Sequence, residues 1–193
     1  MRGTMIGICL VLATLVAVPG DLALAQDKPV GRMALEAAAP LLDQLKSAKD
    51  SATARMLEVE VWSAWTNSGD SEIDALMAKA GALMQASALD EALAVLDSVV
   101  VKAPGFAEGW NQRATLLYMM NDFDGSLADI THVLALEPRH FGALSGIGLI
   151  RVAKGDKLGA VAAYKKVLEI DPMNSGAKAS IEALAKTLDG API

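Results

Sequence analysis

Similar residues return every 34 positions along the middle of the chain. Five sets keep this step: Pro104, Pro138 and Pro172; Val99, Val133 and Val167; Leu76, Trp110 and Leu144; Ala80, Ala114 and Gly148; and Ala92, Ser126 and Ala160. All five sets share one phase between Ile73 and Asn174. A fixed period of this length is typical of repeat proteins, so the sequence predicts three copies of one structural unit, stacked side by side.

The apolar residues within one unit predict two α-helices. In the first unit Leu76, Ala80 and Leu83 lie on one face of a helix, and a broader apolar stripe runs from Leu89 to Val100. The small residue in each helix lets the two backbones approach closely. The proline after the second helix cannot continue it and turns the chain into the next unit.

The segment NDFDGS, residues 121–126, carries acidic residues at alternate positions before a glycine, as calcium loops do. A calcium loop with Gly125 as its sixth residue needs a carboxylate at its first position, where Met120 stands. The repeat phase instead places the segment between the two helices of the middle unit. We therefore expect a turn in which Asp122 caps the second helix, and no metal site.

These units resemble the tetratricopeptide repeat (TPR) family, whose repeats are helix-turn-helix pairs. The middle unit matches the family at Trp110, Ala114, Leu117, Phe123, Ser126, Ile130 and Pro138. It departs at Arg113, as the first unit does at Lys79, where leucine is common, and we expect such departures to loosen local packing. The third unit departs at Arg151 and Lys157. The resemblance implies an all-α, TPR-type α-solenoid and by itself implies no activity.

The repeat phase divides the chain into seven parts. They are a signal peptide (1–25), a flexible tether (26–38), an N-terminal helix pair (39–70), three TPR units (71–106, 107–140 and 141–174), and a C-terminal capping helix with a tail (175–193). The apolar run Met5–Pro19 and the small residues Ala23 and Ala25 predict cleavage after Ala25. We expect an exported, periplasmic protein, like the small exported TPR proteins of Gram-negative bacteria that it resembles. The alternative is an uncleaved anchor in the inner membrane.

The N-terminal helix pair fits the repeat only in part. Leu42 and Trp62 keep the repeat phase, but Lys46 and Glu58 fall where small residues belong. We interpret the pair as a degenerate repeat or a cap, with Trp62 and Trp65 sealing the first repeat. An aromatic binding surface is the alternative.

Groups that carry chemistry are sparse. Cys9 is the only cysteine and lies in the predicted signal peptide, so the mature chain has no thiol. The two histidines, His132 and His140, are expected at the surface. The net charge of -6 disfavours nucleic acid and anionic membranes as partners. We therefore expect no catalytic residue, no metal, no cofactor and no membrane insertion after cleavage.

The resemblance implies a concave groove lined by the first helix of each unit. The residues expected to bind a partner there are Met77, Met84, Asn111, Thr115, Tyr118, Ser145, Leu149 and Val152, with Asn111 and Tyr118 orienting it. Well-known peptide-binding relatives hold a terminal carboxylate with lysine and arginine, and neither occupies these positions. The resemblance and these residues together predict a non-catalytic protein-interaction scaffold in the cell envelope, which binds an apolar or amphipathic peptide segment. The alternatives are a self-assembling homo-oligomeric envelope protein and, less favoured, an envelope enzyme or metal-binding protein.

Overall fold

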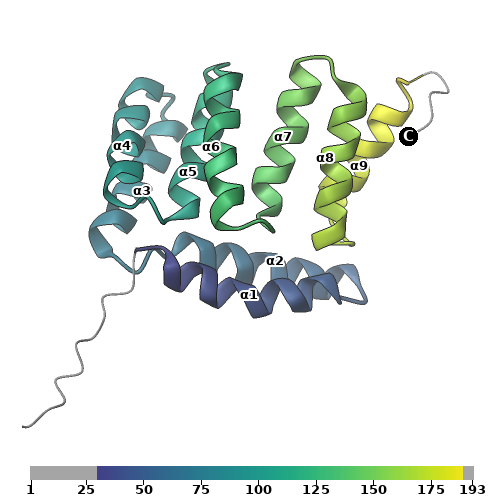
Figure 1. Cartoon of the computed structure of the whole chain (residues 1–193), viewed down its shortest axis with the longest axis horizontal. Helices are drawn as coiled ribbons and strands as arrows, with labels where there is room; N and C mark the ends of the chain where they lie inside the picture. The colour runs from purple at the N-terminus through teal and green to yellow at the C-terminus, as the bar shows by residue number, and fades with distance from the viewer. Residues whose placement is uncertain (1–29, 189–193) are drawn as a thin grey trace, which may run out of the picture.

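The computed structural model describes residues 30–188 (Figure 1). Its helices are α1 (Arg32–Lys46), α2 (Ser51–Thr66), α3 (Ser71–Gln85), α4 (Leu89–Lys102), α5 (Ala107–Met119), α6 (Phe123–Leu136), α7 (Phe141–Ala153), α8 (Lys157–Ile170) and α9 (Ser175–Ala185). Residues 30–188 contain no strand, which confirms the all-α prediction. No helix within that range is long and apolar enough to span a membrane. The predicted signal peptide and the first residues of the predicted tether lie outside the described part.

Helices α3 to α8 form three successive pairs, and α9 packs on α8. The small residues predicted at the helix contacts are buried and bring the backbones together. A Cβ atom added to Gly148 in α7 would lie 2.6 Å from the ring of Tyr164 in α8. The Ser126 hydroxyl in α6 donates a 2.7 Å hydrogen bond to the backbone oxygen of Ala114 in α5. Close pairing of helices is thus encoded by residue size at facing positions.

The NDFDGS segment is the turn between α5 and α6, as predicted. Asn121 adopts a left-handed backbone with φ of 64°, and its equivalents Ser87 and Gly155 do the same at 58° and 78°. The Asp122 carboxylate accepts a hydrogen bond from the backbone N–H of Gly125 at 2.9 Å. Asp156 caps α8 in the same way through Gly159. Each turn therefore combines a left-handed helix end with, in two of the three, a capping carboxylate.

Helices α1 and α2 form an antiparallel pair, here called the strap, which crosses the edge of the array where successive repeats are joined (Figure 1). The strap does not stack on α3 and α4 as a further repeat; its main contacts with the array are to α5 and α8. Large charged residues at the two positions that should be small, Lys46 and Glu58, are consistent with this, since they prevent repeat-like packing. The strap and the third repeat share the largest apolar core of the described chain, which includes Leu42, Leu45, Val61, Trp65, Leu144 and Tyr164.

Helix α1 begins earlier than predicted, so residues 32–38 are helical and not a flexible tether. Ala34 and Ala38 are buried, which fixes this part of the helix. Gly31 precedes the helix with φ of 88°, and its N–H donates to the backbone oxygen of Ser68 at 2.9 Å. A Cβ atom on Gly31 would lie 2.5 Å from the Cα atom of Phe106. Only glycine fits this backbone conformation and this close approach.

The strap contacts all three junctions that follow the repeats, and it does so at equivalent positions. Phe106, His140 and Asn174 precede α5, α7 and α9 and are spaced by 34 residues. Phe106 lies against Gly31, the His140 ring stacks on Trp65 with centroids 4.0 Å apart, and Asn174 donates to Glu58 Oε1 at 3.1 Å. One helix pair thereby braces the whole array.

Three expectations about single residues are wrong. Trp62 and Trp65 do not seal the first repeat, because both pack against Phe141 at the start of α7. His140 is not at the surface: its exposed fraction is 0%. Because the strap covers this junction, Trp65 and His140 are buried there and Trp62 is half-buried.

Arg113 does not loosen the local packing, so this expectation is wrong: its side chain links neighbouring helices. Its guanidinium group forms two hydrogen bonds of 2.7 Å with the buried Asp129 carboxylate and one of 2.8 Å with Asp97. The hydrogen bond to Asp129 is the main cause that raises the pKa of Arg113 above its ordinary value. Arg113 thus ties α5 to both neighbouring second helices, α4 and α6.

Candidate interaction groove

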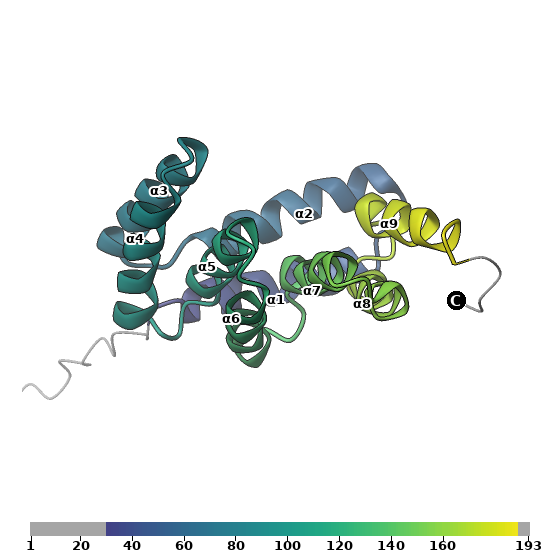
Figure 2. The same ribbon diagram turned by 90° about the horizontal axis from the view of Figure 1, so that it is seen from above.

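The first helices of the repeats, α3, α5 and α7, form the inner side of an arc, and α2 runs along that side (Figure 2). Two hollows lie along it. The larger, about 490 Å³, is lined by Thr66 of α2, by Met77 and Gly81 of α3, and by Glu108 and Gln112 of α5, among others. The smaller, about 60 Å³, lies between α5 and α7. Together they form the groove of this protein.

The predicted groove residues fall into three groups. Met77 lines the larger hollow, and Asn111, Thr115, Tyr118 and Leu149 line the smaller one. The remaining three line neither of these hollows: Met84, Ser145 and Val152. The structure therefore brings four of the predicted residues together around one hollow.

Leu149 and Val152 remain exposed to 45% and 44%, although both are large and apolar. Both belong to α7, an inner helix of the arc. The Ser145 hydroxyl on the same helix donates to the backbone oxygen of Phe141 at 2.8 Å. The Thr115 hydroxyl donates likewise to the backbone oxygen of Asn111 at 3.0 Å. Because both hydroxyls bond to their own helix, α5 and α7 offer a partner fewer polar groups than their composition indicates.

Asn111 is held inside the fold. Its exposed fraction is 9%, and its side-chain Nδ2 donates to Glu108 Oε2 at 3.0 Å. The same oxygen lies 3.3 Å from Nε2 of His140. The Nδ1 atom of His140 accepts the backbone N–H of Ala143 at 3.2 Å, so the ring proton belongs on Nε2 and points to Glu108. Asn111 thus joins a buried polar network that reaches the strap at Trp65.

The model of the family described as "Tetratricopeptide repeat" matches residues 111–175. A TPR repeat-containing protein of Rhizobium etli is 37% identical over 150 residues, which are 78% of this chain and 74% of that protein. The chain belongs to the tetratricopeptide repeat family. Together with the observed helix pairs, this confirms the predicted TPR-type solenoid.

Further similarities concern parts of the TPR array. The Hsp70-Hsp90 organizing protein of Triticum aestivum is 31% identical over 119 residues, which are 62% of this chain and 20% of that protein. Two solved structures share the fold: the first TPR of Spaghetti (RPAP3) bound to the HSP90 peptide SRMEEVD, and the MamA protein. Their TM-scores are 0.58 and 0.54 at 23% and 20% identity. The first covers 63% of this chain and 97% of its own, the second 79% and 81%.

The TPR groove of this chain carries no Lys or Arg among the described residues that line its two hollows. Asp74 and Glu108 line the larger hollow, but both carboxylates are already engaged. Asp74 accepts from the Ser68 hydroxyl at 2.6 Å and from the Ser68 N–H at 3.0 Å. The Tyr118 side chain packs on Phe123, with ring centroids 5.6 Å apart, and its hydroxyl makes no hydrogen bond within the described chain. Tyr118 is therefore the polar group of the smaller hollow that is free to meet a ligand.

Thr66 and Gln112, which were not predicted from the sequence, also line the larger hollow of the TPR groove. Gln112 follows the predicted Asn111 by one position on α5, so it lay outside the helix face that was considered. Thr66 ends α2, and nothing in the repeat pattern indicates that the strap reaches the groove.

Proposed function

We propose that this TPR protein is a non-catalytic interaction scaffold, which binds an apolar or amphipathic peptide segment in the groove. The observation that carries the proposal is the exposed apolar side chain of Leu149, which lines the smaller hollow on the inner helix α7; Val152, three residues further along this helix, is exposed as well. Covering such surface is favourable by about 25 cal/mol per Å². A peptide with aliphatic side chains at helical spacing supplies the matching surface, and Tyr118 offers it one hydrogen bond.

The relatives support a peptide as the kind of partner. The Spaghetti TPR structure holds an HSP90 peptide, and the wheat protein is named for organising Hsp70 and Hsp90. The groove of this chain lacks the cations that an acidic peptide requires. We therefore assign it an apolar or amphipathic segment and not an acidic one.

The binding experiment compares two variants with matched changes. Peptides are selected from a displayed library on the immobilised mature chain, and their affinities are measured by fluorescence anisotropy. Leu149→Asp should raise the Kd of the selected peptides about ten-fold or more, which corresponds to a loss of ~1.4 kcal/mol of binding free energy. Leu158→Asp changes a similarly exposed leucine (53%, against 45% for Leu149) on the second helix α8 and should have no effect. Equal binding to both variants, or selection of no peptide, contradicts the groove assignment.

We further propose that the protein acts in the periplasm after removal of residues 1–25. The support is the signal-peptide pattern that ends at Ala25. Fractionation of cells that express the full chain, followed by N-terminal sequencing, tests it. A soluble periplasmic product that begins at Gln26 is expected. A product that retains Met1 in the membrane fraction would establish the uncleaved anchor instead.

A further inference from the structure

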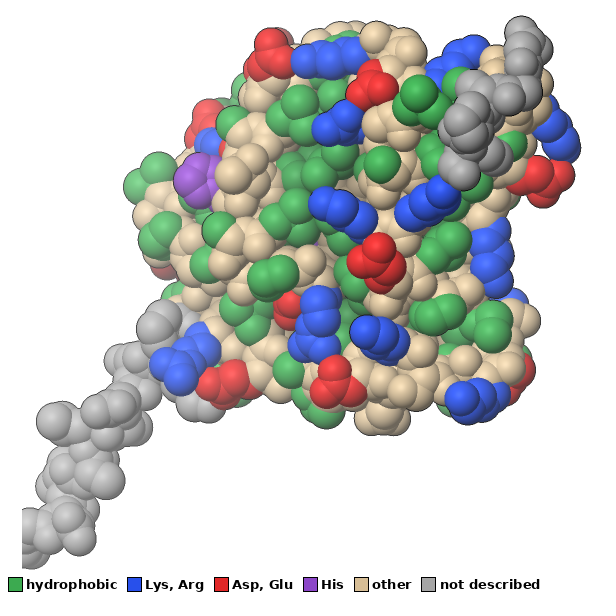
Figure 3. Space-filling view, turned by 45° about the vertical axis from the view of Figure 1, so that its right-hand side comes forward, with side chains coloured by type: hydrophobic (Ala, Val, Ile, Leu, Met, Phe, Trp, Pro, Cys, Tyr) green, Lys and Arg blue, Asp and Glu red, His purple; other side chains and the backbone are tan. Residues whose placement is uncertain are grey.

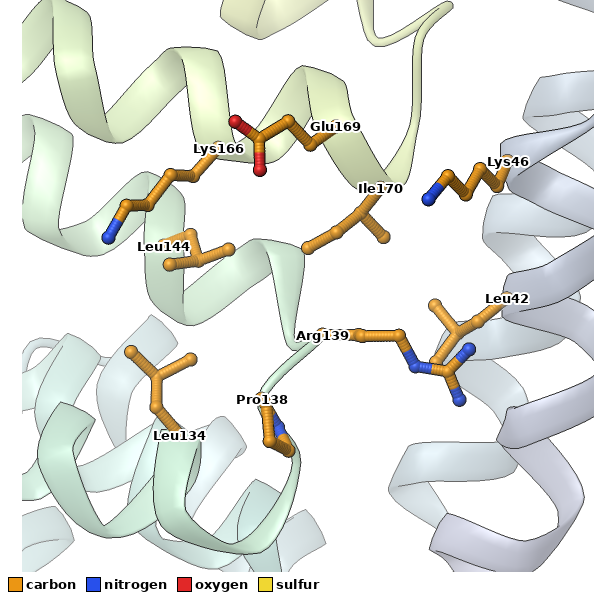
Figure 4. A pocket seen from close by; sticks show the side chains of 9 residues that line it. All are labelled: Leu42, Lys46, Leu134, Pro138, Arg139, Leu144, Lys166, Glu169 and Ile170. Carbon is orange, nitrogen blue, oxygen red and sulfur yellow. The ribbon is translucent and has the colours of Figure 1, made fainter.

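A second depression lies outside the groove, between the strap and the third repeat. It has a volume of about 450 Å³ and is formed by α1, α8 and the connection between α6 and α7 (Figure 4). We call it the strap pocket. Its floor is apolar, with Leu42 and Leu144 buried and Ile170 half-buried. The floor can take up an aliphatic side chain.

The rim of the strap pocket carries three cations and one carboxylate: Lys46, Arg139, Lys166 and Glu169. Arg139 is already neutralised, since its Nη1 lies 2.7 Å from Asp43 Oδ1 and its Nε lies 3.7 Å from Glu137 Oε1. Lys46 and Lys166 form no ion pair within the described chain. Figure 3 shows Lys and Arg side chains bordering apolar surface on this side of the molecule. Unpaired cations beside an apolar floor favour an anionic ligand in the strap pocket, although the net charge of the chain is -6.

The positions of the two lysines restrict the shape of that ligand. Lys46 extends from α1 on one side of Ile170, and Lys166 extends from α8 on the other (Figure 4). A ligand with one carboxylate can neutralise only one of them. A ligand that pairs with both has to cross the apolar floor, so it needs an aliphatic group between two acidic groups.

We propose that the strap pocket binds a short acidic peptide segment in which aliphatic side chains stand between carboxylates. The aliphatic part is buried on Leu42, Leu144 and Ile170, and the carboxylates pair with Lys46 and Lys166. The site differs from the groove in place and in charge, and it does not depend on the function proposed for the groove. Because exposed ion pairs contribute little and are screened by salt, binding is weak and decreases as salt is added.

The probe is the fluorescein-labelled peptide Glu-Glu-Leu-Leu-Glu-Glu, titrated with the mature chain and followed by anisotropy. Saturable binding is expected for this peptide. It should be lost for Gln-Gln-Leu-Leu-Gln-Gln, which lacks the charges, and for Glu-Glu-Ser-Ser-Glu-Glu, which lacks the apolar part. Equal binding of all three peptides overturns the proposal. So does preferential binding of phosphatidylglycerol vesicles, since this would assign the pocket to a lipid surface.

Two double variants with the same charge change locate the site. Lys46→Gln with Lys166→Gln should weaken the acidic peptide about ten-fold. Lys49→Gln with Lys165→Gln, which changes exposed lysines that do not line the pocket, should leave binding unchanged. Equal effects of the two double variants would show non-specific attraction and would overturn the proposal.

A variant of Glu169 should strengthen binding of the acidic peptide, where the lysine variants weaken it. Because Glu169 is the carboxylate among the residues that line the pocket, Glu169→Gln should tighten binding of the acidic peptide. The groove variant Leu149→Asp should bind that peptide as the wild type does. If Leu149→Asp no longer bound the acidic peptide, the peptide would bind in the groove, and the proposal for the strap pocket would be wrong. If only the peptides selected on the groove failed to bind, the proposed function of the groove would be wrong and the strap pocket would be unaffected.

Discussion

The imidazole ring of His140 lies flat on the indole ring of Trp65, with centroids 4.0 Å apart and an interplanar angle of 10°. Both side chains are fully enclosed, with exposed fractions of 0% and 1%. His140 caps the start of α7, and Trp65 lies in the last turn of α2, so this contact fixes the strap on the third repeat. The Nε2 atom of His140 forms a hydrogen bond of 3.3 Å with Oε2 of Glu108 in α5.

We expect Trp65→Ala to lower the free energy of unfolding by about 3–5 kcal/mol, the usual range for removing a buried aromatic side chain. The strap should also loosen, so that limited proteolysis cuts between α1 and α2 sooner. Urea unfolding followed by circular dichroism measures the first effect. Met56→Ala, at a side chain exposed to 65% on the same helix, is the control and should change stability little. Similar losses in both variants would mean that Trp65 does not hold the strap.

The carboxyl group of Glu58 makes stability depend on pH. Burial, together with the hydrogen bond and the charge of Asp171, raises the pKa of Glu58 to about 7, although Asn174 and Arg55 act in the opposite direction. Oδ2 of Asp171 is buried without a partner, and protonated Glu58 can donate to that carboxylate. Since the folded state holds this proton more tightly, the stabilisation is complete below pH 4.5, the ordinary pKa of Glu58, and is lost as pH rises through about 7.

Glu58→Gln isolates this effect, because glutamine keeps a donor and does not titrate. The variant should be more stable than the wild type above the raised pKa of Glu58, and the difference should shrink as the solution is acidified. Urea midpoints measured across this pH range for both chains give the comparison. Parallel curves would show that Glu58 does not share a proton with Asp171.

Arg113→Met should lower stability by about 3 kcal/mol, because it leaves the buried Asp129 carboxylate without its partner. Adding Asp129→Asn removes the uncompensated charge and should restore part of the loss. Asp97 is exposed to 56%, so Asp97→Asn should cost less than about 1 kcal/mol. Thermal unfolding of the four chains ranks them. If the double variant is no more stable than Arg113→Met, the buried charge is not the cause.

Asn111→Ala and Tyr118→Phe should separate fold from binding. Asn111 holds Glu108 in the buried network, so its loss should cost about 1–2 kcal/mol of stability. Tyr118→Phe removes only a hydroxyl that is free of hydrogen bonds and should leave the melting temperature unchanged. It should nevertheless weaken the peptides selected on the groove. If Tyr118→Phe bound these peptides as tightly as the wild type does, the hydroxyl would make no contribution to peptide binding.

The array was predictable from sequence because its determinants are local. Gly148 and Ser126 mark close helix contacts by size alone, and Asp122 marks a helix start, whatever surrounds them. The strap was not predictable in the same way, since Trp65 meets His140 only through tertiary packing. Lys46 and Glu58 were the available signal: side chains too large for a repeat contact indicate a pair that packs elsewhere. The position of Asn111 on the inner helix face was predictable, but its burial beside Glu108 and His140 was not, because that also depends on tertiary packing.

The contacts of the strap join residues that are made at very different times during translation. Asp43 meets Arg139 across 96 residues, and Glu58 meets Asn174 across 116. The helical pairs of the repeats can form as each leaves the ribosome, whereas the strap, which is synthesised before them, can complete its contacts only after the third pair and Asn174 have emerged. The strap is therefore made before the repeats but reaches its final contacts after them.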